Sequence, residues 1–196
     1  MARSLGLFRL LWISAAAVGA VMALASSARA DSPSCPDAPI TPATPSGLAE
    51  RVQLLEDYTA IEELKAAYGY AIDAVVADPT KIDDLLRLFT DNICLDYGPL
   101  GRFNGKAAVK TFFQTVVPSL SAWNFHVASH PILRINGSVA SGAWRVVAHG
   151  VSKTPPGTQV STSFARYRDR YEKTATGWKF RTITVIFDVP PLAPAP

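Results

Sequence analysis

The chain has 196 residues, of which 19 are basic and 16 acidic, so its formal net charge at neutral pH is +3. Three of the arginines and none of the acids lie in residues 1–30, so the rest of the chain carries 16 charges of each sign. A chain that is neutral outside its first 30 residues lacks the basic surface of a nucleic-acid-binding protein, and we expect no nucleic-acid partner.

Residues 1–30 have the pattern of a secretory signal. Arg3 and Arg9 give a charged start, residues 10–24 contain no ionisable group, and Ala28-Arg29-Ala30 places small residues where a signal peptidase cleaves. The apolar run is shorter than the about 20 residues of a spanning helix, which favours cleavage over an uncleaved membrane anchor. We therefore expect a secreted or periplasmic protein with no stable membrane span after cleavage.

Two Pro-rich segments flank the predicted domain. Residues 31–47 and 189–196 are poor in core-forming side chains and predict an extended linker and a tail, which leaves residues 48–188 as one domain of ordinary size. Cys35 lies in the linker and Cys94 in a predicted strand. An exported chain with two cysteines permits a disulfide, but the sequence neither supports nor excludes this pair.

The first half of the domain has the period of helices. Apolar residues recur three or four apart from Leu48 to Ala77, which predicts one long amphipathic helix, although Thr59 followed by Glu62 leaves open a restart there. After a break at Asp78-Pro79, we expect a short helix over Lys81–Phe89 and a strand over Ile93–Tyr97.

The chain then returns to a helical period and changes to a period of two. A third helix is predicted from Gly105 to about Val117, where Pro118 stops it. Turn-forming residues separate four strand candidates, Trp123–Ile135, Ala140–Lys153, Gln159–Lys173 and Trp178–Val189. Such short connections allow only antiparallel pairing. The fold class is therefore α+β, with a curved antiparallel sheet wrapped on the long N-terminal helix around a conical cavity.

Six short motifs occur in order over this domain. They are Ala71-Ile72-Asp73, Asp96-Tyr97, Gly101 to Ala108, His126, Gly142-Ala143-Trp144, and Tyr167-Arg168-Asp169-Arg170-Tyr171 with Gly177-Trp178-Lys179. In this order the chain resembles the SnoaL-like branch of the nuclear transport factor 2-like superfamily, over roughly residues 52–188. The resemblance implies an α+β cone that binds a hydrophobic small molecule and commonly forms a homodimer or homotrimer.

Asp73 and His126 are the principal catalytic candidates. Asp73 lies on or beside the apolar stripe of the long helix, where a carboxylate is costly unless it is paired. A carboxylate facing an imidazole fixes the ring tautomer and lets the ring move a proton. The aligned positions form a catalytic Asp–His pair in dehydratase and dehydrochlorinase members of the superfamily. The alternatives are a solvated aspartate and a structural strand histidine.

The resemblance adds further candidates. Asp96 matches the general base of isomerase members, so the sequence leaves open whether it or Asp73 serves as base. The predicted pocket is completed by Tyr68, Tyr97, Trp144, His149, Tyr167 and Asp169. Tyr68 and Tyr97 could equally pack in the core, and Asp169 could equally be structural.

These features predict a cofactor-independent lyase or isomerase, such as a dehydratase, isomerase or cyclase. His126 would move a proton, Asp73 would orient the ring, and a tyrosine would polarise a substrate oxygen. We expect no metal and no cofactor, since the sequence has no Cys/His set with zinc spacing, no nucleotide-binding Gly-rich loop and no nucleophile elbow. The alternative is a non-catalytic secreted binding or dimerisation domain of the same fold.

Overall fold

The computed structural model describes residues 35–153 and 160–188. The predicted signal at 1–30 and the tail at 189–196 lie outside the described residues. None of the helices in the described ranges combines the length and apolar character needed to cross a membrane.

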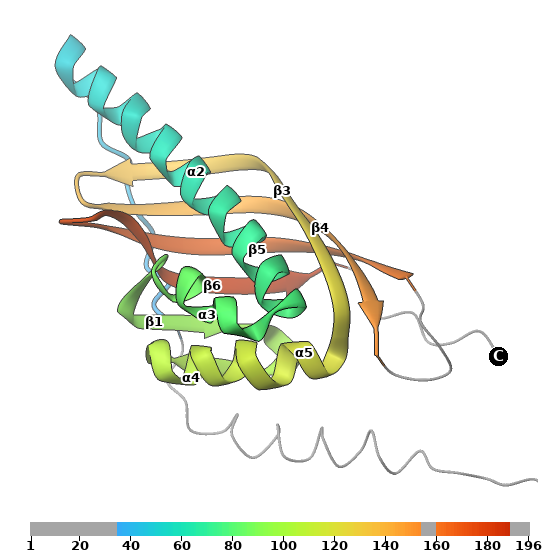
Figure 1. Cartoon of the computed structure of the whole chain (residues 1–196). Helices are drawn as coiled ribbons and strands as arrows, with labels where there is room; N and C mark the ends of the chain where they lie inside the picture. The colour runs from blue at the N-terminus through green and yellow to red at the C-terminus, as the bar shows by residue number, and fades with distance from the viewer. Residues whose placement is uncertain (1–34, 154–159, 189–196) are drawn as a thin grey trace, which may run out of the picture. The chain divides into compact units, whose positions relative to one another are not determined.

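A single 30-residue helix, α2 (Leu48–Ala77), runs across one face of the sheet (Figure 1). It has no restart at Thr59, whose hydroxyl donates to the carbonyl of Leu55 in the preceding turn. The helix ends before Asp78-Pro79, as proline cannot continue it. The buried side chains of α2 lie in its later turns. They form an apolar stripe that includes Ile61, Leu64, Tyr68, Ile72 and Val75.

The first turns of α2 extend beyond the sheet. Leu48 and Leu55 are 77% and 68% exposed, so the predicted apolar stripe is longer than the surface that covers it. Figure 1 shows this end of the helix projecting past the strands.

The segment after α2 differs in part from the prediction. A 3-10 turn (Pro79–Lys81) and the short helix α3 (Ile82–Leu86) precede β1 (Phe89–Asp96), which begins earlier than predicted. After a second 3-10 turn (Gly98–Leu100), the three-residue strand β2 (Arg102–Asn104), not predicted from the sequence, pairs antiparallel with β1.

The third helix passes Pro118, where the prediction ended it. It consists of α4 (Gly105–Thr111), a π-helical turn (Phe112–Val116) and α5 (Val117–Leu120). Pro118 is the second residue of α5, directly after the π-helical turn, and the helix continues to Leu120. The prediction that this proline stops the helix was wrong.

The strands form one curved six-stranded sheet with the order β2-β1-β6-β5-β4-β3. Its long strands are β3 (Ser121–Asn136), β4 (Val139–Ser152), β5 (Val160–Thr174) and β6 (Gly177–Phe187), paired antiparallel as predicted. β1 pairs parallel with β6. In β3 the register shifts between Ser129 and Ile132, where His130 has a positive φ of 53°, so the strand bends at His130-Pro131.

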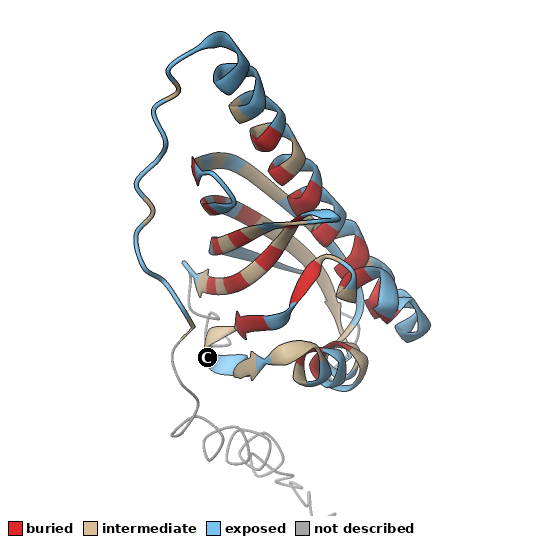
Figure 2. Cartoon of the chain, turned by 90° about the vertical axis from the view of Figure 1, so that its left-hand side faces the viewer, coloured by how far each residue is buried: buried red, intermediate tan, exposed pale blue. Residues whose placement is uncertain are grey.

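Residues 35–47 form a strap on the sheet face opposite α2 (Figure 2). Cys35 and Cys94 form a disulfide, with a Cα–Cα distance of 5.5 Å, which the sequence had left open. At the other end the N–H of Ala43 donates to the carbonyl of Ile135, and the Asn136 amide donates to the carbonyl of Thr41. This part of the predicted linker is therefore attached to the domain at both ends.

The Gly-x-Trp motif has a packing explanation. A Cβ atom added to Gly142 would lie 2.8 Å from Trp144 Nε1, 2.9 Å from Leu133 Cδ2 and 3.0 Å from the Tyr171 hydroxyl. Trp144 Nε1 donates to that hydroxyl across 2.9 Å. The missing side chain of Gly142 therefore leaves the space in which this hydrogen bond forms.

We predict that Gly142→Ala lowers the free energy of unfolding by about 1–3 kcal/mol, as overpacking of a close-packed core does. The matched control is Gly69→Ala on α2, whose added Cβ would lie 3.7 Å from the carbonyl oxygen of His126. That distance is an ordinary van der Waals contact, and alanine stabilises a helix by about 1 kcal/mol relative to glycine. Urea unfolding measures both, and equal effects would contradict the packing explanation.

Candidate functional site

Asp73 and His126 come together where α2 crosses β3. Asp73 Oδ1 lies 2.6 Å from His126 Nδ1, and Asp73 Oδ2 accepts the backbone N–H of His126 at 3.0 Å. The carboxylate thus fixes both the backbone and the ring of one residue. Gly69, one turn earlier on α2, lies against the backbone and Cβ of His126.

This contact determines the tautomer of the imidazole. An ionised carboxylate only accepts hydrogen bonds, so in the neutral ring Nδ1 carries the proton and Nε2 carries the lone pair. Nε2 has no hydrogen-bond partner among the described residues. The His126 and Asp73 side chains are 17% and 21% exposed, so the pair is largely but not fully shielded from solvent.

His126 borders two hollows. The first, here called the cavity, is about 360 Å³ and lies between the sheet and the α4–α5 helices. The second, here called the groove, is about 610 Å³ and lies between α2 and β3. Asp73 lines only the groove, whereas His126 and Tyr167 line both. The imidazole therefore lies at the boundary between the two hollows.

The cavity wall is mainly apolar on the helical side and carries hydroxyl groups on the sheet side. Phe112, Phe113 and Val117 supply aromatic and aliphatic surface. The sheet contributes the polar residues Ser121, Asn124, Ser152, Ser161 and Ser163. Such a wall can bury a hydrophobic molecule and still bond a few of its polar atoms.

Two buried tyrosines, Tyr68 and Tyr167, and the partly buried Tyr97 surround the same region. The hydroxyl oxygens of Tyr68 and Tyr97 lie 2.6 Å apart in a shared hydrogen bond. Burial raises the pKa of Tyr97 to about 12 and holds the pKa values of Tyr68 and Tyr167 well above their ordinary range. All three are therefore neutral phenols near neutral pH and can donate hydrogen bonds. Tyr97 and Tyr167 line the cavity, and Tyr68 lines the groove.

Asp169 is engaged in a buried ion pair and lines neither the cavity nor the groove. Its Oδ2 lies 2.8 Å from Lys65 Nζ and accepts the Tyr171 hydroxyl at 2.9 Å. The Lys65 ammonium also lies 3.5 Å from the centroid of the Tyr167 ring. Burial raises the pKa of Asp169 and lowers that of Lys65, and the attraction between the two opposes both shifts. Trp144 joins this network through Tyr171 and also lines the groove.

Asp96, the alternative base, lies outside both hollows. It accepts from Arg102 Nη2 at 2.7 Å and from the Gly98 N–H at 2.9 Å. Alternate residues of a strand share a face, so Asp96 lies on the same face as Cys94, which is bonded to the strap. The Asp96 carboxylate is thus directed away from the cavity.

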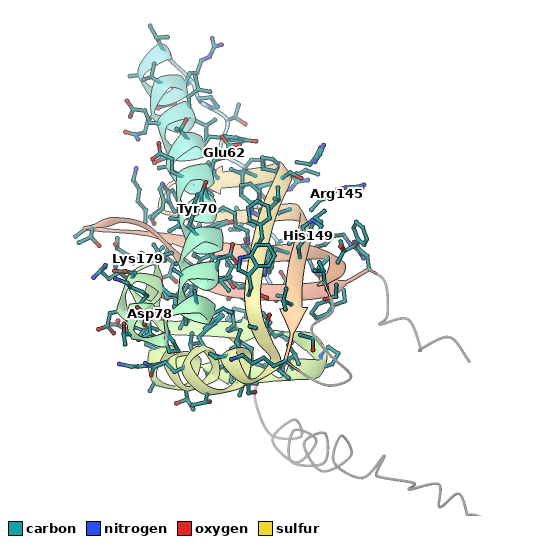
Figure 3. The ribbon with its side chains drawn as sticks, turned by 45° about the vertical axis from the view of Figure 1, so that its right-hand side comes forward. Glu62, Tyr70, Asp78, Arg145, His149 and Lys179 are labelled. Atoms are coloured by element: carbon teal, nitrogen blue, oxygen red, sulfur yellow. A yellow bond between two sulfur atoms is a disulfide. The ribbon has the colours of Figure 1, made fainter. Side chains whose placement is uncertain are left out.

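His149 contributes to the cavity wall, but its ring lies on the other face of the sheet. Its Nδ1 lies 3.0 Å from the Thr162 hydroxyl, and its ring is 6.5 Å from that of Phe125. Phe125 precedes His126 on β3 and points to the opposite face. Figure 3 shows His149 on the same side of β4 as Arg145.

Sequence reasoning missed Lys65 and the polar sheet wall. Lys65 follows Ile61 by four residues and precedes Tyr68 and Ile72 by three and seven, which is the spacing of a buried helix stripe. A lysine within such a stripe is a signal for a buried ion pair, although it does not identify the partner. Across residues 35–153 and 160–188, no three His, Cys, Asp or Glu side chains are grouped to hold a metal ion.

Comparisons with known proteins agree with this architecture. The family model of the SnoaL-like domain matches residues 53–184 of this chain. A crystal structure from Novosphingobium aromaticivorans, provisionally named an aromatic ring hydroxylase, is 30% identical, covers 69% of this chain and 92% of its own, and has a TM-score of 0.61. A search of curated proteins gave no match.

Two less similar structures share the fold. One, from Novosphingobium aromaticivorans and provisionally named a scytalone dehydratase, is 18% identical with a TM-score of 0.62, and the match covers 71% of this chain and 89% of that one. The other is a hexachlorocyclohexane dehydrochlorinase from Novosphingobium barchaimii, 19% identical with a TM-score of 0.63, covering 74% and 96% of the two chains.

We predict that Lys65→Met lowers the free energy of unfolding by about 3–5 kcal/mol, because it leaves the Asp169 carboxylate buried without its cation. The double variant Lys65→Met with Asp169→Leu should recover much of this loss, because it removes both charges. Urea unfolding of the two variants tests the pair. If the double variant is no more stable than Lys65→Met, the loss of stability does not come from the uncompensated Asp169 charge, and the prediction is contradicted.

The raised pKa of Tyr97 predicts a loss of stability in alkali. The folded chain keeps the phenol proton up to about pH 12, whereas the unfolded chain loses it near 10, so the native state binds more protons between these values and stability falls as pH rises through them. Tyr97→Phe should make this fall shallower. Urea midpoints at pH 9 and at about pH 11 measure the slope, and an unchanged slope would contradict the prediction.

Proposed function

Because the chain belongs to the SnoaL-like family of the nuclear transport factor 2-like superfamily, we propose that it is an exported lyase or isomerase that needs no cofactor. Its substrate is a hydrophobic small molecule with a ring or a carbonyl group. The observation that carries the proposal is the Asp73 carboxylate at 2.6 Å from His126 Nδ1, beside a mainly apolar cavity.

Proton transfer is the chemistry that this pair supports. His126 Nε2, with a free lone pair, takes a proton from a substrate carbon next to a carbonyl, and the ring becomes an imidazolium. Asp73 stabilises that cation across the hydrogen bond to Nδ1. The imidazolium then returns the proton to a leaving group in an elimination, or to another carbon in an isomerisation.

A substrate oxygen gains negative charge when the proton leaves. Tyr97 and Tyr167 line the cavity as neutral phenols, and a phenol donor directed at such an oxygen lowers the barrier. The apolar cavity wall strengthens this interaction, since hydrogen bonds to charge are stronger where water is excluded.

The names of two fold neighbours support a lyase assignment. A dehydratase removes water and a dehydrochlorinase removes hydrogen chloride, and both eliminations include the loss of a proton from the substrate. The identities of 18% and 19% relate these proteins to the chain by fold alone, so the choice among dehydratase, isomerase and cyclase depends on the substrate.

Export is supported by the signal-like residues 1–30 and by the Cys35–Cys94 disulfide, because disulfides persist in oxidising compartments.

A homodimer or homotrimer is supported by apolar side chains on the sheet face opposite α2. Trp123, Phe125 and Phe164 are each nearly half exposed there, and a second copy of the chain would cover them. Light scattering of the purified chain tests this, and a monomer would contradict it.

We predict that His126→Ala lowers turnover by about 10²–10⁴-fold, which is the usual contribution of a general acid–base group, while ligand affinity is retained. Asp73→Asn should lower turnover as well, because an amide does not stabilise the imidazolium. His130→Asn is the matched control, since the exposed His130 lines neither hollow and asparagine tolerates its positive φ, and it should leave turnover unchanged.

The measurement does not require the natural leaving group. Cyclic ketones that bind the chain are incubated in D₂O, and NMR follows deuterium incorporation beside the carbonyl. Exchange that is lost in His126→Ala and kept in His130→Asn supports the proposal. Ligands that bind tightly without any exchange would favour a non-catalytic binding protein.

A further inference from the structure

Three arginines line a hollow of about 620 Å³ between the strap and the sheet face opposite α2. Arg134 comes from β3, and Arg168 and Arg170 come from β5. We call this space the arginine hollow. The strand register aligns Arg134, Ser141 and Arg170 in one row across β3, β4 and β5, so the guanidinium groups emerge on one face of the sheet.

A single carboxylate from the strap reaches this hollow. Asp37 Oδ1 lies 3.2 Å from Arg170 Nη2, and Asp37 Oδ2 lies 3.5 Å from Arg168 Nη1. The Asp37 side chain is 53% exposed, so it covers the hollow from the solvent side. Asp169 also borders the hollow, but its charge is matched by Lys65 on the other side of the sheet.

The hollow has more donors than Asp37 satisfies. Arg170 Nη1 is buried and has no hydrogen-bond partner in the described part of the chain. Arg134 likewise has no ion pair within these residues. An arginine presents several N–H donors in a planar fork that matches the oxygens of a carboxylate or a phosphate. One aspartate against three guanidinium groups leaves an excess of positive charge.

We propose that the arginine hollow is a binding site for a small oxyanion, a carboxylate or a phosphate, and that Asp37 occupies it as an intramolecular competitor. The site lies on the sheet face opposite the cavity, so it is independent of the proton-transfer chemistry proposed above. The Ser141 and Thr41 side chains at the rim can donate further hydrogen bonds to the oxygens of such a ligand.

The strap is built to hold this competitor in place. The disulfide at Cys35 anchors the chain two residues before Asp37, and the Ala43–Ile135 hydrogen bond anchors it six residues after. Prolines at positions 36, 39 and 42 favour an extended backbone and supply no N–H donors. A tethered group acts at an effective concentration in the millimolar range, so a free oxyanion must compete against it.

The test is calorimetric titration of the oxidised full chain with inorganic phosphate and, separately, with succinate. Sodium chloride at matched ionic strength controls for general screening. We expect Asp37→Asn to bind the preferred oxyanion about tenfold more tightly than the parent chain, since one charge-assisted competitor is removed. The two titrations identify phosphate or carboxylate as the preferred group.

Two arginine variants separate a built site from surface charge. In the Asp37→Asn background, Arg170→Gln should abolish binding, whereas Arg166→Gln should leave it unchanged, since Arg166 pairs with Asp188 at 2.5 Å outside the hollow. If Arg170→Gln fails to fold, Arg170→Lys replaces it, because lysine keeps the positive charge but lacks the planar fork of guanidinium donors. Equal losses in the Arg166 and Arg170 variants, or no gain from Asp37→Asn, would overturn the proposal.

Discussion

The structure depends on how α2 is held against the concave face of the sheet. Asp57 of α2 accepts hydrogen bonds from Lys173 and Trp178 of the sheet. Two further polar contacts fix α2, the buried pair between Lys65 and Asp169 and the two hydrogen bonds that Asp73 accepts from His126. The two α2 residues are eight positions apart, about 12 Å along a helix, so together they set both the position and the direction of α2. The first contact binds β5 in the core, and the second binds β3 at the edge of the sheet. The cavity remains beyond the second contact, where the sheet curves away towards α4 and α5.

The two contacts differ in what they can do chemically. The Lys65–Asp169 pair is shielded from solvent and surrounded by aromatic rings, so its charges are committed to each other and serve the position of Tyr167 and Tyr171. The Asp73–His126 pair keeps one ring nitrogen without a partner among the described residues, and this nitrogen belongs to a residue that borders both hollows. Helix α2 thus contributes Lys65 to a buried ion pair that orders the core, and Asp73 to a more accessible pair for which we propose proton transfer. The ring of Tyr167 contacts the Lys65 ammonium of the first pair, and Tyr97 and Tyr167 line the cavity.

Much of the fold follows from local sequence, and the parts that do not are those set by distant partners. The bounds of α2 follow from the period of its apolar residues and from the break at Asp78-Pro79. The antiparallel meander follows from the turns at Asn136-Gly137 and at Gly177, where both glycines have positive φ angles. Strand β2 and the parallel pairing of β1 with β6 were missed, because three residues give no periodic signal and pairing depends on chain segments far apart. Asp73 and His126 were found because each supplies what the other needs. Asp96 looked equivalent until Arg102 and the disulfide face showed which way it points, and Asp37 looked like part of a loose linker.

The central claim is that Asp73 holds His126 with the proton on Nδ1, so that Nε2 is free to exchange protons with a substrate. The most direct measurement is nitrogen-15 NMR of the His126 ring in the parent chain and in Asp73→Asn. The account predicts a protonated Nδ1 and a lone pair on Nε2 in the parent chain at neutral pH, and a loss of this preference in the variant. A proton on Nε2 in the parent chain, or the same tautomer mixture in both proteins, would contradict it.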